Sequence, residues 1–210
     1  HSKNKPVYQL IGPLLKPVVR AYATGPDPHW YYDQGFTAHK FFQTWTGHES
    51  DYDRAIVSAS TWREISSPDS LIMVDGYMSW TVEMAKEMGK RLSAFDIYWF
   101  EDVLSPDDMD GQAALRMLLK PVLIAGGEHE FTYHGFSEIA QKGALDLWQP
   151  DVTWCGGITE VLRIIELATQ FGVGVVLHRG GEVWGLHVIA ATTCHDMDEV
   201  VLGKRGDLQD

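Results

Sequence analysis

The stretch LDLWQPDVTWCGGITEVLRIIELATQFGVGVVLH, residues 145–178, contains in order an apolar run, a helical segment and a second apolar run. The runs at 145–151 and 173–178 are too short for helices and are apolar on both faces, which is typical of buried parallel strands. Gly172 follows the helical segment as a C-cap. One face of that segment carries only apolar side chains, those of Val161, Leu162, Ile164, Ile165 and Ala168. The stretch therefore predicts a strand-helix-strand unit with parallel strands under helical cover.

The same alternation extends along the whole chain. Apolar residues recur with the spacing of a helix at 52–65, 81–92, 107–119, 135–142 and 158–171. Eight candidate strands lie at 18–24, 36–41, 70–75, 97–102, 121–128, 145–151, 173–178 and 199–203. Eight such units predict an α/β fold, a TIM-like (β/α)8 barrel formed by residues 1–210, because a doubly wound open sheet usually has fewer strands. With 210 residues the chain is shorter than the roughly 250 typical of such barrels, so we expect an incomplete barrel.

Composition excludes several classes of protein. With 45% hydrophobic and 22% charged residues, the chain is expected to fold as a globular domain. Its net charge of −12 makes nucleic acid and anionic membrane surfaces poor partners. Cys155 and Cys194 lack zinc-site spacing and indicate a reducing compartment. No apolar stretch approaches the roughly 20 residues of a membrane span, and the first ten residues lack a signal-peptide core, so we expect a cytoplasmic protein.

Acidic residues or a histidine close five consecutive candidate strands. They are Asp75, Glu101, Glu128, Asp151 and His178. Strand ends one unit apart point into the same bowl of a barrel, so these side chains should converge. The first three carboxylates would repel one another unless a cation lay between them, and oxygen ligands suit Mg²⁺. The alternative is that each acidic residue only caps the following helix.

Asp151 and His178 end neighbouring strands and form a candidate general base. The carboxylate would accept a hydrogen bond from one imidazole nitrogen and leave the other nitrogen basic. The alternatives are a structural histidine and an aspartate that holds a turn after Pro150.

Four motifs show a family resemblance: VDGYMSW at 74–80, WFED at 99–102, GEHE at 127–130 and QPDVTWCGGITE at 149–160. They resemble the enolase superfamily, in particular the mandelate-racemase subgroup and its L-rhamnonate and related acid-sugar dehydratases. The resemblance implies a Mg²⁺ held by Asp75, Glu101 and Glu128 and a dyad of Asp151 and His178. It further implies a hydro-lyase that removes the proton α to the carboxylate of a sugar acid and yields a 2-keto-3-deoxy acid. Relatives are commonly multimeric, so a homo-oligomer is expected.

Further candidate residues come from comparison with the pattern of that family. Glu199 would bind the enediolate or orient His178, although Asp198 or Asp196 could take its place. Some members of the family have a Lys-x-Lys pair on the second strand, where this chain has the single lysine Lys40. Lys40 either neutralises the charge of the substrate carboxylate or enediolate or is a solvated lysine at the end of the strand. Candidate substrate contacts are His129, with support of a metal ligand as the alternative, and Arg179, in a loop that also contains Gly180, Gly181 and Glu182.

The α+β capping domain of the superfamily is not visible before His1, so an uncovered bowl is expected. Two functions from different classes therefore stay open. The first is a Mg²⁺-dependent acid-sugar dehydratase. The second is a catalytically silent barrel fragment with a binding or assembly role, and an epimerase of the same superfamily is a lesser option.

Overall fold

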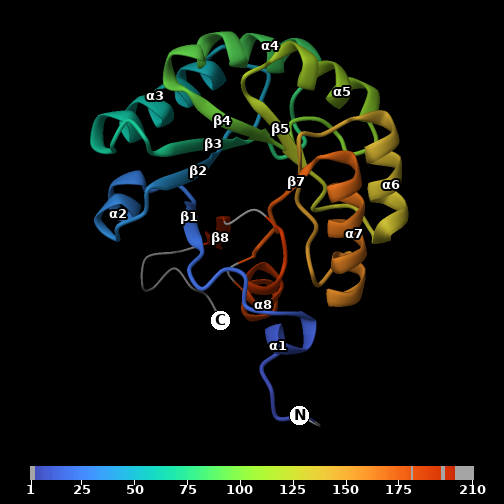
Figure 1. Ribbon diagram of the computed structural model, residues 1–210. Coiled ribbons are helices and arrows are strands. Elements are labelled where there is room, and N and C mark those ends of the chain that lie inside the picture. Colours follow the sequence, from blue (N-terminus) through green and yellow to red (C-terminus); the bar gives the residue numbers. More distant parts are fainter. Residues whose placement is uncertain (1–2, 181, 195–196, 202–210) are drawn as a thin grey trace.

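All eight strands belong to one parallel sheet that curls into a barrel (Figure 1). The computed structural model describes residues 3–180, 182–194 and 197–201. Within them the strand order is β7-β6-β5-β4-β3-β2-β1-β8, and no ladder joins β7 to β8. The predicted barrel is therefore confirmed, with its hydrogen-bonded wall open between these two strands. The strands are β1 Arg20–Thr24, β2 Ala38–Phe42, β3 Leu71–Asp75, β4 Ile97–Glu101, β5 Leu123–Gly126, β6 Leu147–Trp148, β7 Gly174–Val175 and β8 Met197–Val201.

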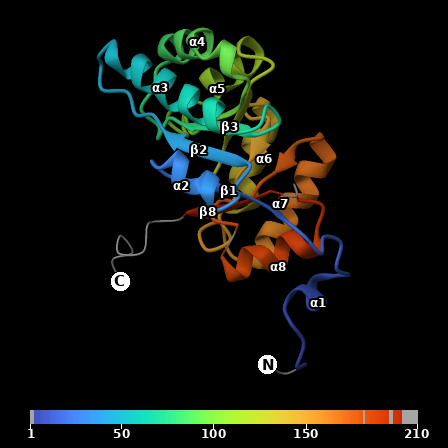
Figure 2. The same ribbon diagram turned by 90° about the vertical axis from the view of Figure 1, so that its left-hand side faces the viewer.

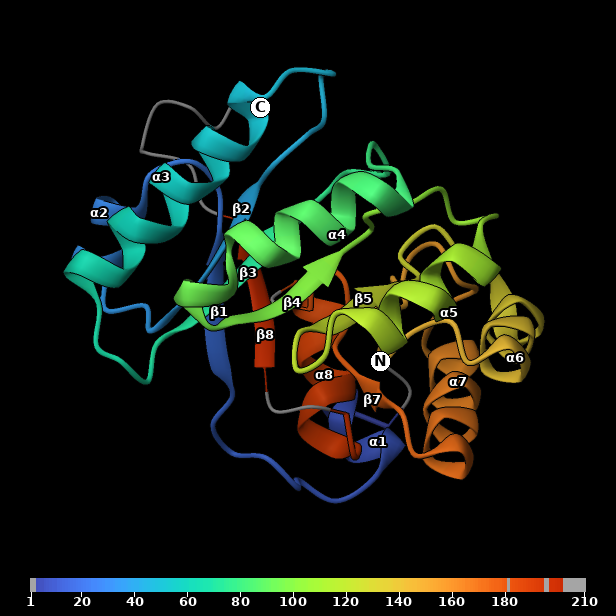
Figure 3. The same ribbon diagram turned by 90° about the horizontal axis from the view of Figure 1, so that it is seen from above.

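The helices cover the outside of the barrel: α3 to α7 form an outer arc around the strands (Figure 1), and α3, α4 and α5 lie in front of the strands in the view from above (Figure 3). All five predicted helices are confirmed, with ends shifted by at most three residues. Among the described residues, none of the helices is long and apolar enough to cross a membrane. The helical elements are α1 Tyr8–Ile11, α2 Pro28–Asp33, α3 Ser50–Ile65, α4 Val82–Arg91, η1 Ser93–Phe95, α5 Met109–Leu118, α6 Thr132–Lys142, α7 Ile158–Phe171 and α8 Val183–Ala191.

Periodicity did not predict α1, α2 or α8. Helix α2 is only six residues long and depends on local signals, with Pro28 in its first turn and the Asp27 side chain accepting a hydrogen bond from the Trp30 backbone N–H. Helix α8 is apolar on nearly all sides, so its sequence has no amphipathic pattern. Helix α1 lies against α8, where the rings of Tyr8 and His187 stack with centroids 6.0 Å apart (Figure 2).

Strand β8 begins at Met197, two residues before the predicted start. The predicted end of this strand, residues 202–203, lies outside the described residues, as does Gly181.

The interior of the barrel has an apolar floor to which seven strands each contribute one side chain, and the residue directly after β7 contributes the eighth. These residues are Tyr22, Ala38, Met73, Trp99, Ala125, Leu147, Val176 and Met197. Side chains two positions apart on a strand point to the same face, so the next inward residues lie one layer higher, toward the carboxyl ends. Those residues form a polar ring of Thr24, Lys40, Asp75, Glu101, Gln149, His178 and Glu199. The fold thus gathers its polar side chains at the rim where barrel enzymes place their chemistry.

Candidate active site

Lys40 is the cation at the centre of the polar ring. Its side chain is 2% exposed, and its Nζ lies 2.9 Å from Glu199 Oε1 and 3.7 Å from Asp75 Oδ2. A third ion pair joins it to Glu101. Burial alone would lower the pKa of Lys40, but the carboxylates of Glu101 and Glu199 raise it well above its ordinary value. Lys40 is therefore a buried, protonated counter-ion, and the alternative of a solvated lysine is wrong.

Glu101 is held by side-chain donors on both of its oxygens. Oε2 accepts hydrogen bonds from Trp99 Nε1 at 2.9 Å and from Gln149 Nε2 at 2.8 Å, while Oε1 pairs with Lys40. Burial raises the pKa of Glu101 to about 7, even though the ammonium of Lys40 opposes that shift. The carboxylate is fixed in place but costly to ionise.

Asp75 and Glu128 have similarly raised pKa values. Asp75 is the register partner of Glu101 on the neighbouring strand, and burial together with the Glu101 carboxylate raises its pKa to about 7. Burial is also the largest cause of the rise in the pKa of Glu128 to about 6, and Asp75 contributes to it. The expected repulsion among these carboxylates is thus present in the structure.

The three carboxylates fit a hard divalent cation. They offer oxygen donors at one rim, and a cation would remove the repulsion that raises their pKa values. Within the described part of the chain, the group whose ligand atoms all lie within 4.8 Å of one another is a neighbouring one, Asp102, Glu128 and His129, and the full set of Asp75, Glu101 and Glu128 does not meet this spacing. Glu128 belongs to both groups, so the centre of acidic ligands extends from Asp75 to His129.

The alternative that these acidic residues cap helices is wrong. The N-cap of α4 is Thr81, whose hydroxyl accepts a hydrogen bond from the backbone N–H of Met84. The N-cap of α5 is Asp108 and that of α6 is Phe131. Asp75, Glu101 and Glu128 stand at least three residues before these positions, so their side chains are available to the bowl.

Asp151 and His178 form the predicted dyad. An isolated bridge pairs the two residues beyond β6 and β7, and His178 Nδ1 lies 2.8 Å from Asp151 Oδ2. Burial raises the pKa of Asp151, but hydrogen bonds from Thr153 and His178 outweigh it and leave the pKa below its ordinary value. An ionised carboxylate only accepts hydrogen bonds, so Nδ1 carries the proton and Nε2 is the basic nitrogen.

Asp151 also holds a turn, as the alternative proposed. Its second oxygen, Oδ1, accepts hydrogen bonds of 2.6 Å from both the backbone N–H and the hydroxyl of Thr153. The two roles use different oxygens of one carboxylate, so the turn fixes the orientation in which Oδ2 meets His178.

The basic nitrogen of the dyad faces the acidic centre. His178 Nε2 lies 3.4 Å from Glu128 Oε2, and the His178 side chain is 20% exposed. The imidazole of the dyad and the Glu128 carboxylate are therefore in contact at the same rim.

Glu199 is the residue that β8 contributes to the polar ring. Oε1 accepts a hydrogen bond of 2.8 Å from the Thr24 hydroxyl, and Oε2 accepts one of 3.0 Å from the backbone N–H of Arg179. Burial would raise the pKa of Glu199, but Lys40 and His178 lower it to about 2. Of its two alternatives, Asp196 and the side chain of Asp198 lie outside the described residues.

The two candidate substrate contacts have protein partners already. His129 Nε2 lies 3.3 Å from Asp102 Oδ2 and 3.5 Å from Glu128 Oε1, which matches the alternative role of supporting a ligand. The Arg179 side chain is 57% exposed, and its guanidinium pairs with Glu182.

Three members of this network were absent from the sequence predictions: Thr24, Trp99 and Gln149. The two-residue period of the strands indicates the inward position of two of them. Thr24 follows inward Tyr22 by two positions, and Gln149 follows inward Leu147 by two positions. Trp99 and Gln149 also lie in the WFED and QPDVTWCGGITE motifs, which do not by themselves indicate a bond to Glu101.

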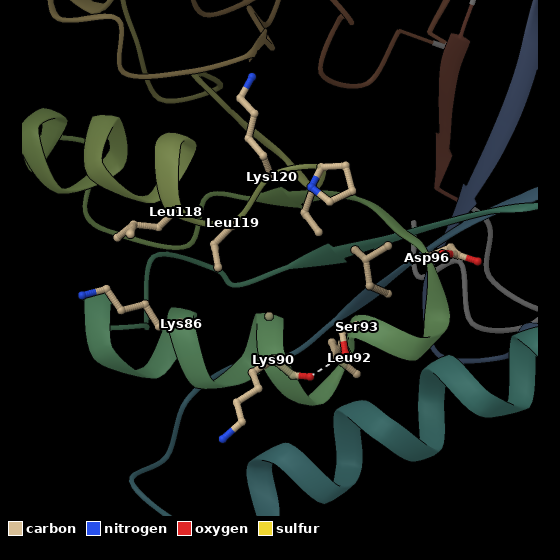
Figure 4. A pocket seen from close by; sticks show the side chains of 12 residues that line it. Lys86, Lys90, Leu92, Ser93, Asp96, Leu118, Leu119 and Lys120 are labelled. Carbon is tan, nitrogen blue, oxygen red and sulfur yellow. Dashed lines mark hydrogen bonds between the residues drawn. The ribbon is translucent and has the colours of Figure 1, made fainter.

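The cavity shown in Figure 4 lies at the opposite end of the barrel and has no comparable network. It measures about 350 Å³ and is lined near the starts of β4 and β5. Lys90 and Lys120 at its edge point in opposite directions, and each has an acidic neighbour, Glu87 at 3.8 Å and Asp146 at 3.6 Å (Figure 4). The polar ring is therefore the better candidate for a functional site.

Comparisons with known proteins agree with this geometry. The model of the family described as "Enolase C-terminal domain-like" matches residues 29–209. A Caldivirga maquilingensis protein named "Putative L-rhamnonate dehydratase" is 35% identical over 190 residues, which are 89% of this chain and 47% of that protein. This chain thus spans about half the length of the curated relative.

Solved structures show the same likeness. The L-rhamnonate dehydratase of Gibberella zeae is 35% identical with a TM-score of 0.86, over 95% of this chain and 51% of that one, and it has also been solved in complex with Mg. The 3,6-anhydro-D-galactonate cycloisomerase of Zobellia galactanivorans is 28% identical with a TM-score of 0.83, over 94% of this chain and 58% of that one.

Proposed function

The chain belongs to the enolase C-terminal domain-like family, and we propose that it is the catalytic barrel of a Mg²⁺-dependent acid-sugar dehydratase. The observation that carries the proposal is the position of His178, whose Nδ1 is bound by Asp151 while Nε2 faces Glu128. The similarity to L-rhamnonate dehydratases supports aldonates as the substrate class.

Asp75, Glu101 and Glu128 would hold the metal. Bound Mg²⁺ supplies Lewis-acid stabilisation of the negative charge that develops on a carboxylate substrate when its α proton leaves. Such a proton is very weakly acidic, so this electrostatic contribution is the largest that the reaction needs.

His178 would act as the general base. The Asp151 carboxylate fixes the tautomer with hydrogen on Nδ1 and stabilises the imidazolium that forms. Nε2 takes the α proton, and the electron pair of the C–H bond moves into the enediolate of the substrate.

Loss of water would follow from the same residue. Protonated His178 donates its new proton to the β-hydroxyl, the C–O bond breaks, and water leaves with the proton. The enediolate electrons form the new carbon–carbon double bond, and the resulting enol tautomerises to the 2-keto-3-deoxy acid. His178 ends the cycle in its starting state.

Lys40 would balance charge in this scheme. Its ammonium is surrounded by three carboxylates, which raise its pKa, so it is held protonated and is a poor base. A two-base epimerase needs a basic group on the opposite face of the substrate, so the state of Lys40 favours dehydration over epimerisation. We assign Glu199 to the orientation of the loop after His178 through its bond to the Arg179 N–H.

We keep His129 and Arg179 as proposed contacts of the substrate hydroxyls. Both side chains are more exposed than the polar ring, and each stands next to a proposed catalytic or ligand residue. Because His129 is paired with Asp102 and Arg179 with Glu182, each would have to exchange a protein partner for the substrate.

The test is solvent deuterium exchange at C2 of a panel of aldonates that includes L-rhamnonate, with Mg²⁺ present. Exchange accompanied by formation of a 2-keto-3-deoxy acid supports the proposal. Exchange without dehydration indicates an epimerase, and absence of exchange on every acid indicates a catalytically silent barrel. The Glu128→Gln variant serves as the metal-site control and should lose the exchange.

A further inference from the structure

We infer that Trp99 and Gln149 are positioning residues that clamp one oxygen of Glu101 and so set which oxygen the carboxylate presents to a cation. The inference rests on the proposed metal site. It concerns two side chains that would not touch the metal and that act only through Glu101.

The clamp is made by neutral donors from two different parts of the barrel. Trp99 Nε1 approaches Glu101 Oε2 at 2.9 Å from two positions earlier on the same strand, and Gln149 Nε2 approaches it at 2.8 Å from the residue after β6. Trp99 and Gln149 are 0% and 1% exposed, so water does not compete for these bonds. Two donors occupy the lone pairs of Oε2, which leaves Oε1 as the oxygen with a cationic neighbour, Lys40.

Gln149 is oriented by Glu101 and by no other described group. Its Nε2 is bonded to Glu101, whereas its Oε1 is buried and has no hydrogen-bond donor among the residues that the structure describes. An unsatisfied buried acceptor is unfavourable. The bond to Glu101 is therefore the contact that holds this amide among the described residues.

Trp99 is the buried tryptophan, among the described residues, whose indole N–H donates to a carboxylate, whereas the indole N–H of buried Trp80 donates to the backbone carbonyl of Gln43. The indole nitrogens of Trp62 and Trp148 are also buried, but neither has a hydrogen-bond partner among the described residues. Both belong to the outer core between sheet and helices, whereas Trp99 belongs to the floor of the bowl. The indole that meets a carboxylate is the one directly beneath the proposed metal site.

The test measures metal affinity directly, with Mn²⁺ as the probe and electron paramagnetic resonance as the readout. Carboxylate ligands depend on their own hydrogen-bond partners, and loss of such a partner typically weakens metal affinity about 10- to 100-fold. We expect losses of that size in Trp99→Phe and in Gln149→Met. The matched controls are Trp148→Phe, which removes an equally buried indole, and Gln112→Met, which removes a buried amide that donates to the Ser105 carbonyl. Both should keep the wild-type affinity.

The possible outcomes separate this inference from the proposed function. If Glu101→Gln loses Mn²⁺ binding while Trp99→Phe and Gln149→Met retain the wild-type affinity, the clamp is overturned and the metal site stands. If all four indole and amide variants weaken binding alike, the effect is general loss of core packing and the clamp is again overturned. If the wild-type protein binds no Mn²⁺, the proposed metal site fails and the clamp fails with it.

A second readout follows the Trp99 indole itself. In protein labelled with 5-fluorotryptophan, the ¹⁹F resonance that disappears in Trp99→Phe should shift when Mg²⁺ is added, and the resonance assigned through Trp148→Phe should not. The Trp99 shift should shrink in Gln149→Met, because the two donors share one oxygen. A Trp99 resonance that does not respond to Mg²⁺ in wild-type protein that binds the ion would contradict the inference.

Discussion

Lys40 Nζ and Glu199 Oε1 lie 2.9 Å apart although β2 and β8 are not neighbours in the sheet. Strand β1 runs between them and contributes the Thr24 hydroxyl to the same oxygen of Glu199. This buried ion pair ties the last strand to the first two at the level of the polar ring, so it matters for stability as well as for the charge of the site.

Replacement of Lys40 by Met should destabilise the protein strongly. Removal of one partner from a buried ion pair leaves an uncompensated charge and costs about 3–5 kcal/mol. Urea unfolding measures the loss, and Lys90→Met, with a side chain 79% exposed, is the control that should change little. The double variant Lys40→Met/Glu199→Gln should be more stable than Lys40→Met alone. Equal stability of these two variants would show that the pair is not the cause.

Replacement of His178 by Asn should remove the proposed base. We expect a fall in C2 proton exchange and in dehydration of at least about 100-fold, the lower limit typical of general acid–base catalysis. Asp151→Asn should also lower the rate, because a neutral amide no longer fixes the tautomer of His178. His134→Asn, on the exposed face of α6, is the matched control. A His178→Asn variant that exchanges the C2 proton at the wild-type rate would rule out this residue as the base.

The metal-free protein should lose stability as the pH rises. Because the pKa values of Asp75 and Glu101 are raised to about 7, the folded state holds protons that the unfolded state has already released. Stability therefore falls as the pH increases toward and through these raised pKa values, by about 1.4 kcal/mol for each unit of upward shift. The fall extends from the ordinary carboxyl pKa of about 4 to the raised value of about 7 and levels off by about pH 8. Below about pH 6.5, buried His39, with its pKa lowered to about 4, contributes an opposite slope, so the last part of the fall, from about pH 6.5 to about pH 8, is the part to measure.

Addition of Mg²⁺ should reduce this slope, since a cation stabilises the ionised carboxylates. Thermal unfolding in EDTA and in Mg²⁺ compares the two states. Asp75→Asn should flatten the slope in EDTA by removing one of the groups. A slope that is the same in EDTA, in Mg²⁺ and in Asp75→Asn would mean that these carboxylates do not cause it.

Replacement of Gly185 by Ala should disturb the loop that follows the base. A Cβ at Gly185 would lie 2.5 Å from the carbonyl oxygen of Gly180, two residues after His178. Such overpacking typically costs about 1–3 kcal/mol and shifts the backbone. We expect lower stability and a lower turnover rate, measured by denaturation and by the dehydration assay. Gly35→Ala is unsuitable as a control because of its φ of +89°, whereas Ala190→Gly alters the same helix without adding volume.

The alternation of strands and helices was enough to predict the barrel and the strand ends that carry Asp75, Glu101 and His178. Helix α8 was missed because a helix that is apolar on nearly all sides has no polar face to reveal its period, whether its side chains are buried, like Val188, or exposed, like Val183. The role of Lys40 was also not predictable, since its three carboxylate partners come from β3, β4 and β8 and their meeting depends on register. The inward position of Gln149 could have been predicted from the strand period, but its hydrogen bond to Glu101 could not.

The apolar floor and the polar ring are two positions apart on the same strands, and this spacing limits how the gene can change. Side chains alternate between the two faces of a strand. Insertion or deletion of one residue between the floor and the polar ring would therefore turn every later side chain of that strand to the opposite face. The polar-ring residue of that strand would then point toward the surrounding helices, and an apolar side chain would face the interior of the barrel. Length variation in this lineage should therefore be confined to the loops beyond the rim and to the helices, while the eight short strands change only by substitution.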